Sequence, residues 1–559
     1  MSTSVIEQKA VESVADPLQE SSNSQCGGKD PAAACVPWPI PPPNPSPEVK
    51  YTKLFINNEW VDSEGGKTFP TKCPSTEKIT ADVSLASDAD VDKAVQAAKR
   101  AFAAASWRRM DASDRGALMN KLADKIDENK YYLACLESMD SGKPYTHTFF
   151  MDTLGISKII RYYAGWTDKI HGKTLPMDGE YLSYTKVLPL GVCGLIVPWN
   201  MPLISLAMKL GPALCCGNTV VVKPSEYTPL STLFVASLAQ EAGFPAGVIN
   251  VVPGAGKTGA AIAAHKDVNK VSFTGSVKVG RLIEEAATKS NLKKVSLELS
   301  GNNPNIILPD ADVDVAVEQA HQAVFMNQGQ MCTAGSRTFV HEDIYEEFVA
   351  KSVARASRRV VTSPFELFCE QGPQISQDHF DRILNLIQTG IKEGAKLECG
   401  GYRHGEKGLY IQPTVFSDVK DHMTIAKEEI FGPVQCIFKF STLNEVIQRA
   451  NDTPYGLVAG VFTNDITTAF EVANELENGT VWINCFNAFA AQTPFGGCKI
   501  SGKGKEMGKA AINEYSDTKT VTVKVPQLVK ARPVAREYSS TSLHNDELSC
   551  QEPNAVNGI

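Results

Sequence analysis

The sequence predicts an α/β protein organised around a parallel, doubly wound sheet. From Leu188 to residue 307, short apolar segments of strand length alternate with helical segments, and a second alternating region runs from Thr338 to about Ala491. Strands of a parallel sheet are covered on both faces and therefore appear as continuous apolar runs. Because 559 residues exceed what a single core holds, we expect roughly two to four domains.

The composition excludes several classes of function. Hydrophobic residues make up 43% and charged residues 21% of the chain, as in ordinary soluble globular proteins. A net charge of −8 argues against a nucleic-acid partner, and no apolar run approaches the roughly 18 residues of a membrane span. The 14 cysteines are scattered without a CxxC pair, so we expect no metal site, no disulfide framework and a reducing compartment.

Both ends of the chain are predicted to be disordered. Residues 1–50 are polar and small and finish in a proline-rich run from Pro37 to Pro47, which is typical of a stiff polyproline II spacer. The first 20 residues contain neither an apolar core nor arginines, so they predict no signal or transit peptide and a cytoplasmic location. Residues 528–559 form a second polar tail.

Ordered structure is expected to begin near Tyr51. Residues 53–56 and 59–61 flank Asn57-Asn58, which is a hairpin signature. A helix with acidic residues in its first turn begins at Asp88. Further helices are expected around 115–128, 131–139 and 152–166, followed by a short strand at 180–187.

The two alternating regions and one terminal segment supply the remaining elements. In the first region, strands are expected at 192–197, 219–222, 248–252, 270–273, 295–299 and 305–307, with helices at 203–216, 230–242, 258–265 and 279–289. In the second, strands are expected at 338–340, 435–438, 459–462 and 479–483, with helices at 347–358, 379–393, 443–451 and 468–477. Residues 518–526 alternate cleanly and could add to another sheet or subunit.

Cys332 stands out among the cysteines because of its position. An apolar helical stripe from Val313 to Val324 breaks into the polar turn Asn327-Gln328-Gly329-Gln330, and Cys332 follows. A thiol at such a junction can face a cleft. The same window also fits a small buried hydrophobe, which is the usual role of a cytosolic cysteine.

Two segments after expected strands have the chemistry of a nucleotide site. Lys223 and Glu226 follow a buried strand, where a carboxylate can bind ribose hydroxyls, although a solvated loop pair is the alternative. Gly275-Ser276 lies between a strand and a helix, where backbone N–H groups attract phosphate, but an ordinary turn fits as well. Gly254 to Thr258 is not a P-loop, because residue 251 is valine where the motif requires glycine.

Two polar residues end apolar strands. Glu298, between Leu297 and Leu299, is expected to be desolvated, which raises a carboxyl pKa toward that of a general base. Asn200 follows another strand and has an amide that can donate to an oxyanion. A structural glutamate and a turn asparagine are the alternatives.

Taken together, these segments resemble the NAD(P)-dependent aldehyde dehydrogenase superfamily from about Tyr51 to Gln527. Residues 48–60 are similar to the cytosolic class 1 group, which includes the retinal dehydrogenases. The resemblance is carried by Pro198-Trp199-Asn200, Lys223-Pro224-Ser225-Glu226, Phe273-Thr274-Gly275-Ser276, Leu297-Glu298-Leu299, Asn327-Gln328-Gly329-Gln330-Met331-Cys332, Glu428-Glu429-Ile430-Phe431-Gly432-Pro433 and Pro494-Phe495-Gly496-Gly497.

The resemblance implies a domain plan. It implies a Rossmann-type NAD-binding domain from residues 51–170 and 188–300, and a second α/β catalytic domain from residues 301–511. Residues 171–187 and 512–527 would form a small β oligomerisation arm, and the protein would be a homotetramer.

The resemblance also implies roles for single residues. Cys332 would attack the aldehyde, the Asn200 amide and the Cys332 N–H would hold the oxyanion, and Glu298 would activate water to release the acid. NAD would be the cofactor, because Glu226 would repel the extra phosphate of NADP. The implied cofactor-binding residues are Trp199, Lys223, Glu226, Gly275, Ser276, Glu429 and Phe431.

The implied substrate is a bulky apolar aldehyde, with retinal as a candidate. Gly155 is expected to leave the tunnel mouth open, and Met201 and Met208 to give flexible apolar walls. The positions matching the family's substrate tunnel are Gly155, Met201, Ser205, Met208, Met331, Thr333 and Phe489.

One departure from the family pattern is local to the site. Ser300-Gly301 stands where the family usually has two glycines, and the added Cβ is expected to crowd the nicotinamide or the acyl intermediate. A catalytically weakened, crystallin-type structural protein is therefore the alternative function. A coenzyme A-dependent acylating enzyme is disfavoured by Glu298.

Overall fold

A computed structural model describes residues 40–525 of the chain. The chain divides into residues 1–42 and a compact unit that starts at Pro43, and the description below concerns the described part of that unit. The expectations for residues 1–39 and 526–559 lie outside the described residues.

The first sheet has the predicted doubly wound, parallel topology at its centre. The pairings from β11 through β10, β7 and β8 to β9 are all parallel, whereas β19, β1 and β2 pair antiparallel at the edges. The strand order reverses between β7 and β10, so this is a topological switch point. In spatial order the strands are β19 (Gly502–Lys503), β11 (Lys294–Glu298), β10 (Lys270–Thr274), β7 (Val192–Ile196), β8 (Thr219–Lys223), β9 (Ile249–Val251), β1 (Leu54–Ile56) and β2 (Glu59–Val61).

Alternating side chains of each central strand enter two different cores, which explains why these strands are apolar throughout. Val220 and Val222 of β8 enter one core, and Val221 enters the other. The first core is closed by α3 (Ala112–Glu128), α4 (Lys130–Ser141), α6 (Thr153–Ala164), α7 (Pro202–Cys215) and α8 (Leu230–Ala242). The second is closed by α1 (Asp88–Ala103), α9 (Gly256–Ala264) and α10 (Val277–Ser290).

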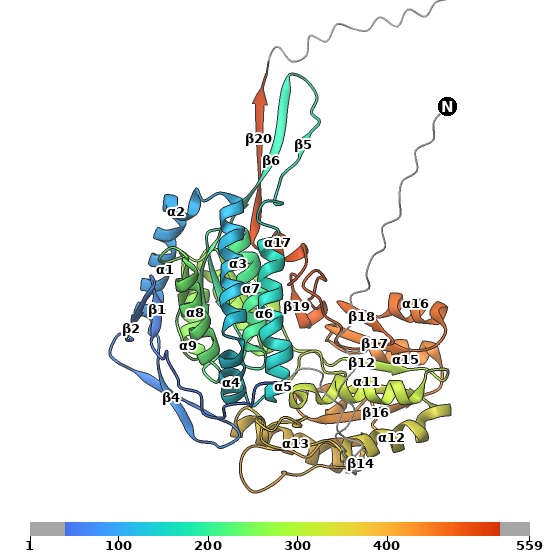
Figure 1. Ribbon diagram of the computed structural model, residues 1–559. Coiled ribbons are helices and arrows are strands. Elements are labelled where there is room, and N and C mark those ends of the chain that lie inside the picture. Colours follow the sequence, from blue (N-terminus) through green and yellow to red (C-terminus); the bar gives the residue numbers. More distant parts are fainter. Residues whose placement is uncertain (1–39, 526–559) are drawn as a thin grey trace, which may run out of the picture. The chain divides into compact units, whose positions relative to one another are not determined.

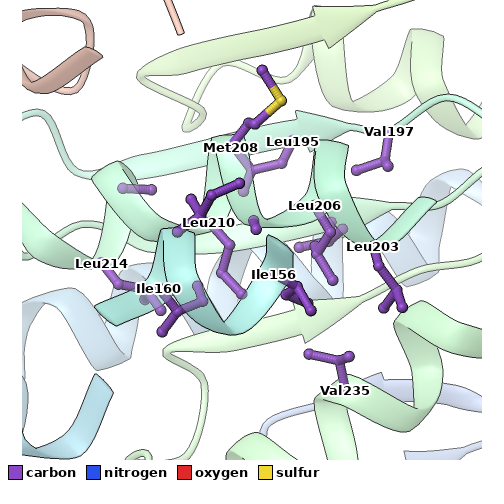
Figure 2. Close-up of a cluster of buried hydrophobic side chains, with 14 of the residues drawn as sticks. Ile156, Ile160, Leu195, Val197, Leu203, Leu206, Met208, Leu210, Leu214 and Val235 are labelled. Carbon is purple, nitrogen blue, oxygen red and sulfur yellow. The ribbon is translucent and has the colours of Figure 1, made fainter. Parts of the chain in front are cut away.

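Helix α7 crosses the first core and reaches the functional cavity described below. Figure 2 shows its leucines packed among Ile156, Ile160 and Val235, with Met208 of the same helix at one edge of the cluster, beside Leu195. The helix therefore uses one side for the core and leaves Met208 available to the cavity lining.

The second sheet is also mainly parallel, with one antiparallel edge pairing between β14 and β15. Helices α11 (Val313–Phe325) and α12 (Tyr345–Ser357) cover one face, and α13 (Gln377–Lys392), α15 (Leu443–Asn451) and α16 (Ile466–Glu475) cover the other (Figure 1). In spatial order the strands are β14 (Lys396–Cys399), β15 (Thr414–Ser417), β16 (Val434–Phe440), β13 (Arg337–His341), β12 (Pro304–Ile307), β17 (Val458–Phe462) and β18 (Thr480–Ile483).

Two small sheets complete the unit. The hairpin β3 (Thr68–Lys72) and β4 (Ile79–Ser84) stands alone, and β20 (Ser516–Lys524) pairs antiparallel with β6 (Tyr181–Pro189), which also pairs with β5 (Thr174–Leu175). Figure 1 shows β20, β6 and β5 running away from the helices of the first sheet. The short helices are α2 (Ala105–Arg108), α5 (Tyr145–His147), α14 (Thr424–Lys427), α17 (Ala510–Glu514), the π-turn Thr148–Asp152 and the 3₁₀ turns Met326–Gly329, Glu342–Ile344 and Lys499–Ser501.

Most elements lie where the sequence placed them, with three differences. Strand β12 belongs to the second sheet, between β13 and β17, and not with the preceding strands of the first. Strands β3, β4, β5, β14, β15 and β19 were not predicted. Residues 43–50, expected to be disordered, are held against α4, because the Tyr132 hydroxyl donates to Glu48 O at 2.6 Å and the Lys50 ammonium lies over the Tyr132 ring. Among the described residues, no helix is long and apolar enough to cross a membrane.

Candidate active site

A cavity of about 930 Å³ lies where the carboxyl ends of three neighbouring strands of the first sheet face segments of the second. Strands β7, β10 and β11 end in Trp199-Asn200, Gly275-Ser276 and Glu298 respectively. Because β7 and β10 flank the switch point, this is the position where α/β sheets bind ligands. The volume is at the upper end of ordinary ligand pockets.

The cavity brings together most of the residues predicted from the sequence. The three predicted catalytic residues, five of the predicted cofactor residues and all predicted tunnel residues line it; they are Cys332, Glu298, Asn200, Trp199, Gly275, Ser276, Glu429, Phe431, Gly155, Met201, Ser205, Met208, Met331, Thr333 and Phe489. Lys223 and Glu226 do not line it. Lys223 is the last residue of β8, the neighbour of β7, and Glu226 follows three residues later. Lys223 Nζ is 3.6 Å from Glu226 Oε2 and donates to Gly254 O at 2.6 Å. What each residue binds stays a prediction.

The cysteine segment is built on a left-handed turn. Asn327, Gln328 and Gly329 have φ of 50°, 59° and 74°, so α11 cannot continue and the chain turns toward Cys332. Asn is among the few residues that tolerate this region, and Gly adopts it freely. The Asn327 amide donates to Asn200 O at 3.0 Å, and the Gln328 amide donates to Gly142 O at 3.1 Å. The turn is therefore held against the segment that follows β7 and against the end of α4.

Gly329 is required by close backbone approach as well as by φ. A Cβ at this position would lie 2.0 Å from Gly432 O and 2.7 Å from Pro433 N. The turn before Cys332 thus packs directly on the segment that contains Glu429 and Phe431.

Cys332 is only partly exposed, and its surroundings favour the protonated thiol over the thiolate. Burial, together with the charges of Glu429 and Glu298, raises the pKa of the Cys332 thiol. Its carbonyl accepts a hydrogen bond of 2.8 Å from Asn303, and a Cβ on Gly301 would lie 2.5 Å from that oxygen.

Asn200 lies beside the cysteine segment. One amide hydrogen of Asn200 goes to Gln330 O at 2.9 Å, which leaves the second to serve as an oxyanion donor.

Glu298 is a buried carboxylate at the end of β11. Its two oxygens are buried and lack a hydrogen bond from any side chain among the described residues, and the residue is 4% exposed. Burial and the nearby charge of Glu506 raise the pKa of Glu298 well above the ordinary range. An unpaired buried carboxylate costs free energy of folding, and in a cavity it has the proton affinity of a general base.

Sequence reasoning missed the ion pair beside Glu298. Lys209 of α7 is fully buried and pairs with Glu506, which lines the cavity, and its ammonium also lies 3.2 Å from Ser272 Oγ. The available signal was a lysine between Met208 and Leu210 on a helix that is otherwise apolar, since lysine is almost never fully buried unless it is paired.

Sequence reasoning also missed two residues of α13 that fix the segment 429–431. Arg382 donates to the carbonyls of Glu429 and Ile430 at 2.7 and 2.8 Å, and His379 Nε2 lies 2.8 Å from Phe431 O. Phe431 has φ of 58° and meets Trp199 edge to face at 5.5 Å. Burial raises the pKa of Glu429 to about 7.

Much of the remaining cavity wall is apolar and rich in methionine. Six of the 12 methionines of the chain line it: Met151, Met201, Met208, Met326, Met331 and Met507. The δ-methyl of Ile204 fills the space next to Gly155, where a Cβ would lie 2.3 Å away. Gly155 therefore allows α6 and α7 to pack closely beside the cavity, and the open mouth expected from the sequence stays a prediction.

Comparisons with known proteins agree with this geometry. The family model described as "Aldehyde dehydrogenase family" matches residues 60–521. Retinal dehydrogenase 2 from Homo sapiens is 60% identical over 490 residues, which are 87% of this chain and 95% of the relative. A mitochondrial aldehyde dehydrogenase from Equus caballus is 58% identical over 497 residues, 89% of this chain and 99% of the relative. A solved NAD⁺ complex of an aldehyde dehydrogenase from Bacillus cereus has a TM-score of 0.84 and 48% identity, covering 85% of this chain and 97% of that one.

The left-handed turn can be tested with two glycine substitutions. Gly329 and Gly394 both have positive φ, but a Cβ on Gly394 meets nothing within 4 Å. We expect Gly394→Ala to cost ~1 kcal/mol of stability from backbone strain alone. Gly329→Ala should cost a further ~1–3 kcal/mol, because the Cβ is forced against Gly432. The measurement is chemical unfolding followed by circular dichroism. Equal losses for the two variants would contradict the close approach.

Proposed function

The chain belongs to the aldehyde dehydrogenase family, and we propose that it oxidises a bulky apolar aldehyde to the carboxylic acid with NAD as the acceptor. One observation carries the proposal: Cys332, Asn200 and Glu298 come from three separate segments and line one cavity at the switch point of the first sheet. Nucleophile, oxyanion donor and general base are the three functions that oxidation through a thioester requires.

The residues around the switch point fit a dinucleotide. Ser276 is the N-cap of α10, with its side chain accepting from Val279 N–H, and Ser276 and Val277 line the cavity, so a pyrophosphate could be held at the start of that helix. Glu226, three residues after β8, is the acidic residue suited to the hydroxyls of a ribose, and it favours NAD over NADP. When bound, NAD supplies the hydride acceptor.

Cys332 and Asn200 carry the first half of the reaction. The Cys332 thiol loses its proton and its sulfur adds to the aldehyde carbon, which leaves a negative oxygen on a thiohemiacetal. The free amide hydrogen of Asn200 is positioned to donate to that oxygen. Loss of hydride from the same carbon then leaves a thioester on Cys332.

Glu298 carries the second half. It takes a proton from a water molecule as the water attacks the thioester carbon, and the Cys332 sulfur leaves as the acid forms. The elevated pKa of Glu298 makes it a stronger base than a solvated carboxylate. Burial is the main cause of that raised pKa, and the negative charge of Glu506, which is paired with Lys209, adds to it.

The cavity wall indicates the class of substrate. Methionine side chains are flexible and polarizable, so a wall built from them adapts to large apolar molecules of irregular shape. Met208 and Met331 are mostly buried, at 8% and 7% exposure, whereas Phe489 is 43% exposed and lies at the rim. A long apolar aldehyde such as retinal fits this lining. The relative named retinal dehydrogenase 2 supports the same substrate class.

The decisive assay is NADH formation with a panel of short, aromatic and retinoid aldehydes. We expect the highest kcat/KM with the bulky apolar aldehydes and no NADH with Cys332→Ala, which removes the sulfur and keeps the fold.

Two other outcomes would redirect the proposal. Comparable kcat/KM for acetaldehyde and retinal would contradict the preference for bulky substrates. Tight NAD binding without NADH from any aldehyde would instead support the structural, crystallin-type alternative.

We also propose that the protein is a homotetramer assembled through the three-stranded sheet. Strand β20 pairs with β6 over nine residues, yet much of this sheet faces solvent, and Tyr181, Leu182 and Val523 are exposed by 46, 41 and 43%. Exposed apolar residues on a projecting sheet are typical of an interface.

The domain roles and the location are also proposals. Residues 51–170 and 188–300 would bind the cofactor and residues 301–511 would complete the catalytic site. A cytoplasmic location remains a proposal, since some relatives are named mitochondrial.

Two deletions separate the role of β20 from that of the residues after it. Deleting 518–559 removes most of β20 and should yield species smaller than a tetramer, because β6 loses its antiparallel partner. Deleting 527–559 keeps the strand and should leave the number of subunits in the assembly unchanged. Light scattering gives the mass of each, and a tetramer of the 518–559 deletion would refute the role of the arm.

A further inference from the structure

A buried cation lies next to the cavity wall. Lys143 follows shortly after α4, and its side chain is 3% exposed. Its ammonium lies 2.6 Å from Asp152 Oδ2 and 3.4 Å from Glu137 Oε1, and both carboxylates are buried as well. Lysine is almost never buried to this extent unless it is paired, so the two carboxylates explain why the charge is tolerated at this place.

The third partner of Lys143 belongs to the cavity wall. The ammonium donates to Met201 Sδ at 3.3 Å, and Met201, which follows Asn200 in the chain, lines the cavity. A lysine ammonium has three protons, and these three acceptors match that number. A thioether is a weak acceptor, but a buried site strengthens its interaction with a full charge. The contact therefore attaches a side chain of the cavity wall to a charge that is itself held by two carboxylates.

The backbones at both ends of this contact are held in place. Gly142, which precedes Lys143, accepts a hydrogen bond of 3.1 Å from the Gln328 amide. At the other end, Met201 O accepts a hydrogen bond of 2.9 Å from Ser205 N–H as α7 begins. The freedom that remains is that of the methionine side chain, which has three rotatable bonds. The ammonium contact selects one of its conformations.

The contact is particular to Met201 and is not a general property of the methionine-rich wall. Among the described residues, Met201 is the only one of the six cavity methionines whose sulfur accepts a hydrogen bond. Met208 lines the same cavity from the same helix, but it packs with the apolar residues of the first core. Met208 is therefore a matched reference for any change made at Met201.

We propose that Lys143 is a positioning residue that holds the Met201 side chain in one conformation and so sets the width of the substrate cavity next to Asn200. A ligand then meets a wall that is already formed at this point, and it does not have to order the Met201 side chain on binding. Asp152 and Glu137 keep the ammonium in place. The link to a bulky apolar substrate rests on the proposed function.

The test removes the ammonium without leaving an unpaired buried charge. Lys143→Met is combined with Asp152→Asn, and Asp152→Asn alone is the matched control, because its ammonium still reaches Met201 and Glu137. Burial raises the pKa of Glu137, whereas the charge of Lys143 lowers it, so Glu137 is expected to take up a proton when the lysine is replaced. The double variant therefore exchanges an ion pair for neutral groups of similar size.

Methionine methyl NMR reports on the contact without any ligand. In protein labelled with ¹³C at the methionine methyl groups, the Met201 signal is identified by its loss in Met201→Leu. We expect this signal to keep its position in Asp152→Asn and to move toward the shift of a freely rotating methionine in the double variant, while the Met208 signal stays where it is. A Met201 signal at the same position in the wild type and in both variants would overturn the proposal.

Binding of retinol, the unreactive alcohol, tests the consequence for the cavity. We expect its Kd, followed by quenching of tryptophan fluorescence, to be ~3–10-fold higher in the double variant than in Asp152→Asn, which is the scale of ordering one flexible side chain. Equal Kd values would overturn the role of Met201 in shaping the cavity. If the wild type binds no retinol, the proposed substrate class fails, while the methyl signals still decide whether Lys143 holds Met201.

Two single variants decide the question if the double variant does not fold. Met201→Leu and Met208→Leu both nearly conserve the volume of the side chain. Only Met201→Leu deprives a buried ammonium proton of its acceptor, so it should lower the midpoint of thermal unfolding further than Met208→Leu does. Equal midpoints for the two variants would count against the contact and overturn the proposal.

Discussion

The contact between Gly329 and Gly432 is the constraint on which the site depends. It joins the left-handed turn before Cys332 to the segment that contains Glu429 and Phe431, at a distance that leaves no room for a Cβ. Hydrogen bonds from Asn327 and Gln328 attach the same turn to Asn200, which follows β7, and to Gly142 at the end of α4. Cys332, Asn200 and the Glu429 segment are therefore positioned as one assembly, although they are far apart in the sequence.

Within that assembly, electrostatics oppose the reactive form of the cysteine. Glu298, Glu429 and Glu506 surround one apolar cavity, and burial raises the pKa of both Glu298 and Glu429. The buried cation Lys209 is already paired with Glu506. Such an arrangement favours a strong base at Glu298 and a protonated thiol at Cys332.

Structure could be predicted from the sequence where a local pattern of residues has one physical explanation. The buried run Val220–Val222 predicted a strand covered on both faces, and Asn-Gln-Gly before Cys332 predicted a break in the helix. The sequence was not informative about partners brought together only by folding. Lys209 and Glu506 are 297 residues apart, and β12 could be assigned to its sheet only once its neighbours β13 and β17 were known. The close neighbour of Gly155 was likewise hidden, because the δ-methyl beside it comes from Ile204, on another helix.

In the proposed mechanism, Cys332 carries the acyl group and Glu298 releases it. The most direct test of these roles is the Glu298→Gln protein mixed with NAD and an apolar aldehyde, followed by rapid absorbance and by intact and peptide mass spectrometry. We expect a burst of one NADH per active site, a mass increase equal to the acyl group on Cys332, and almost no turnover afterwards. Continued turnover at the wild-type rate, or acylation of a different residue, would contradict it.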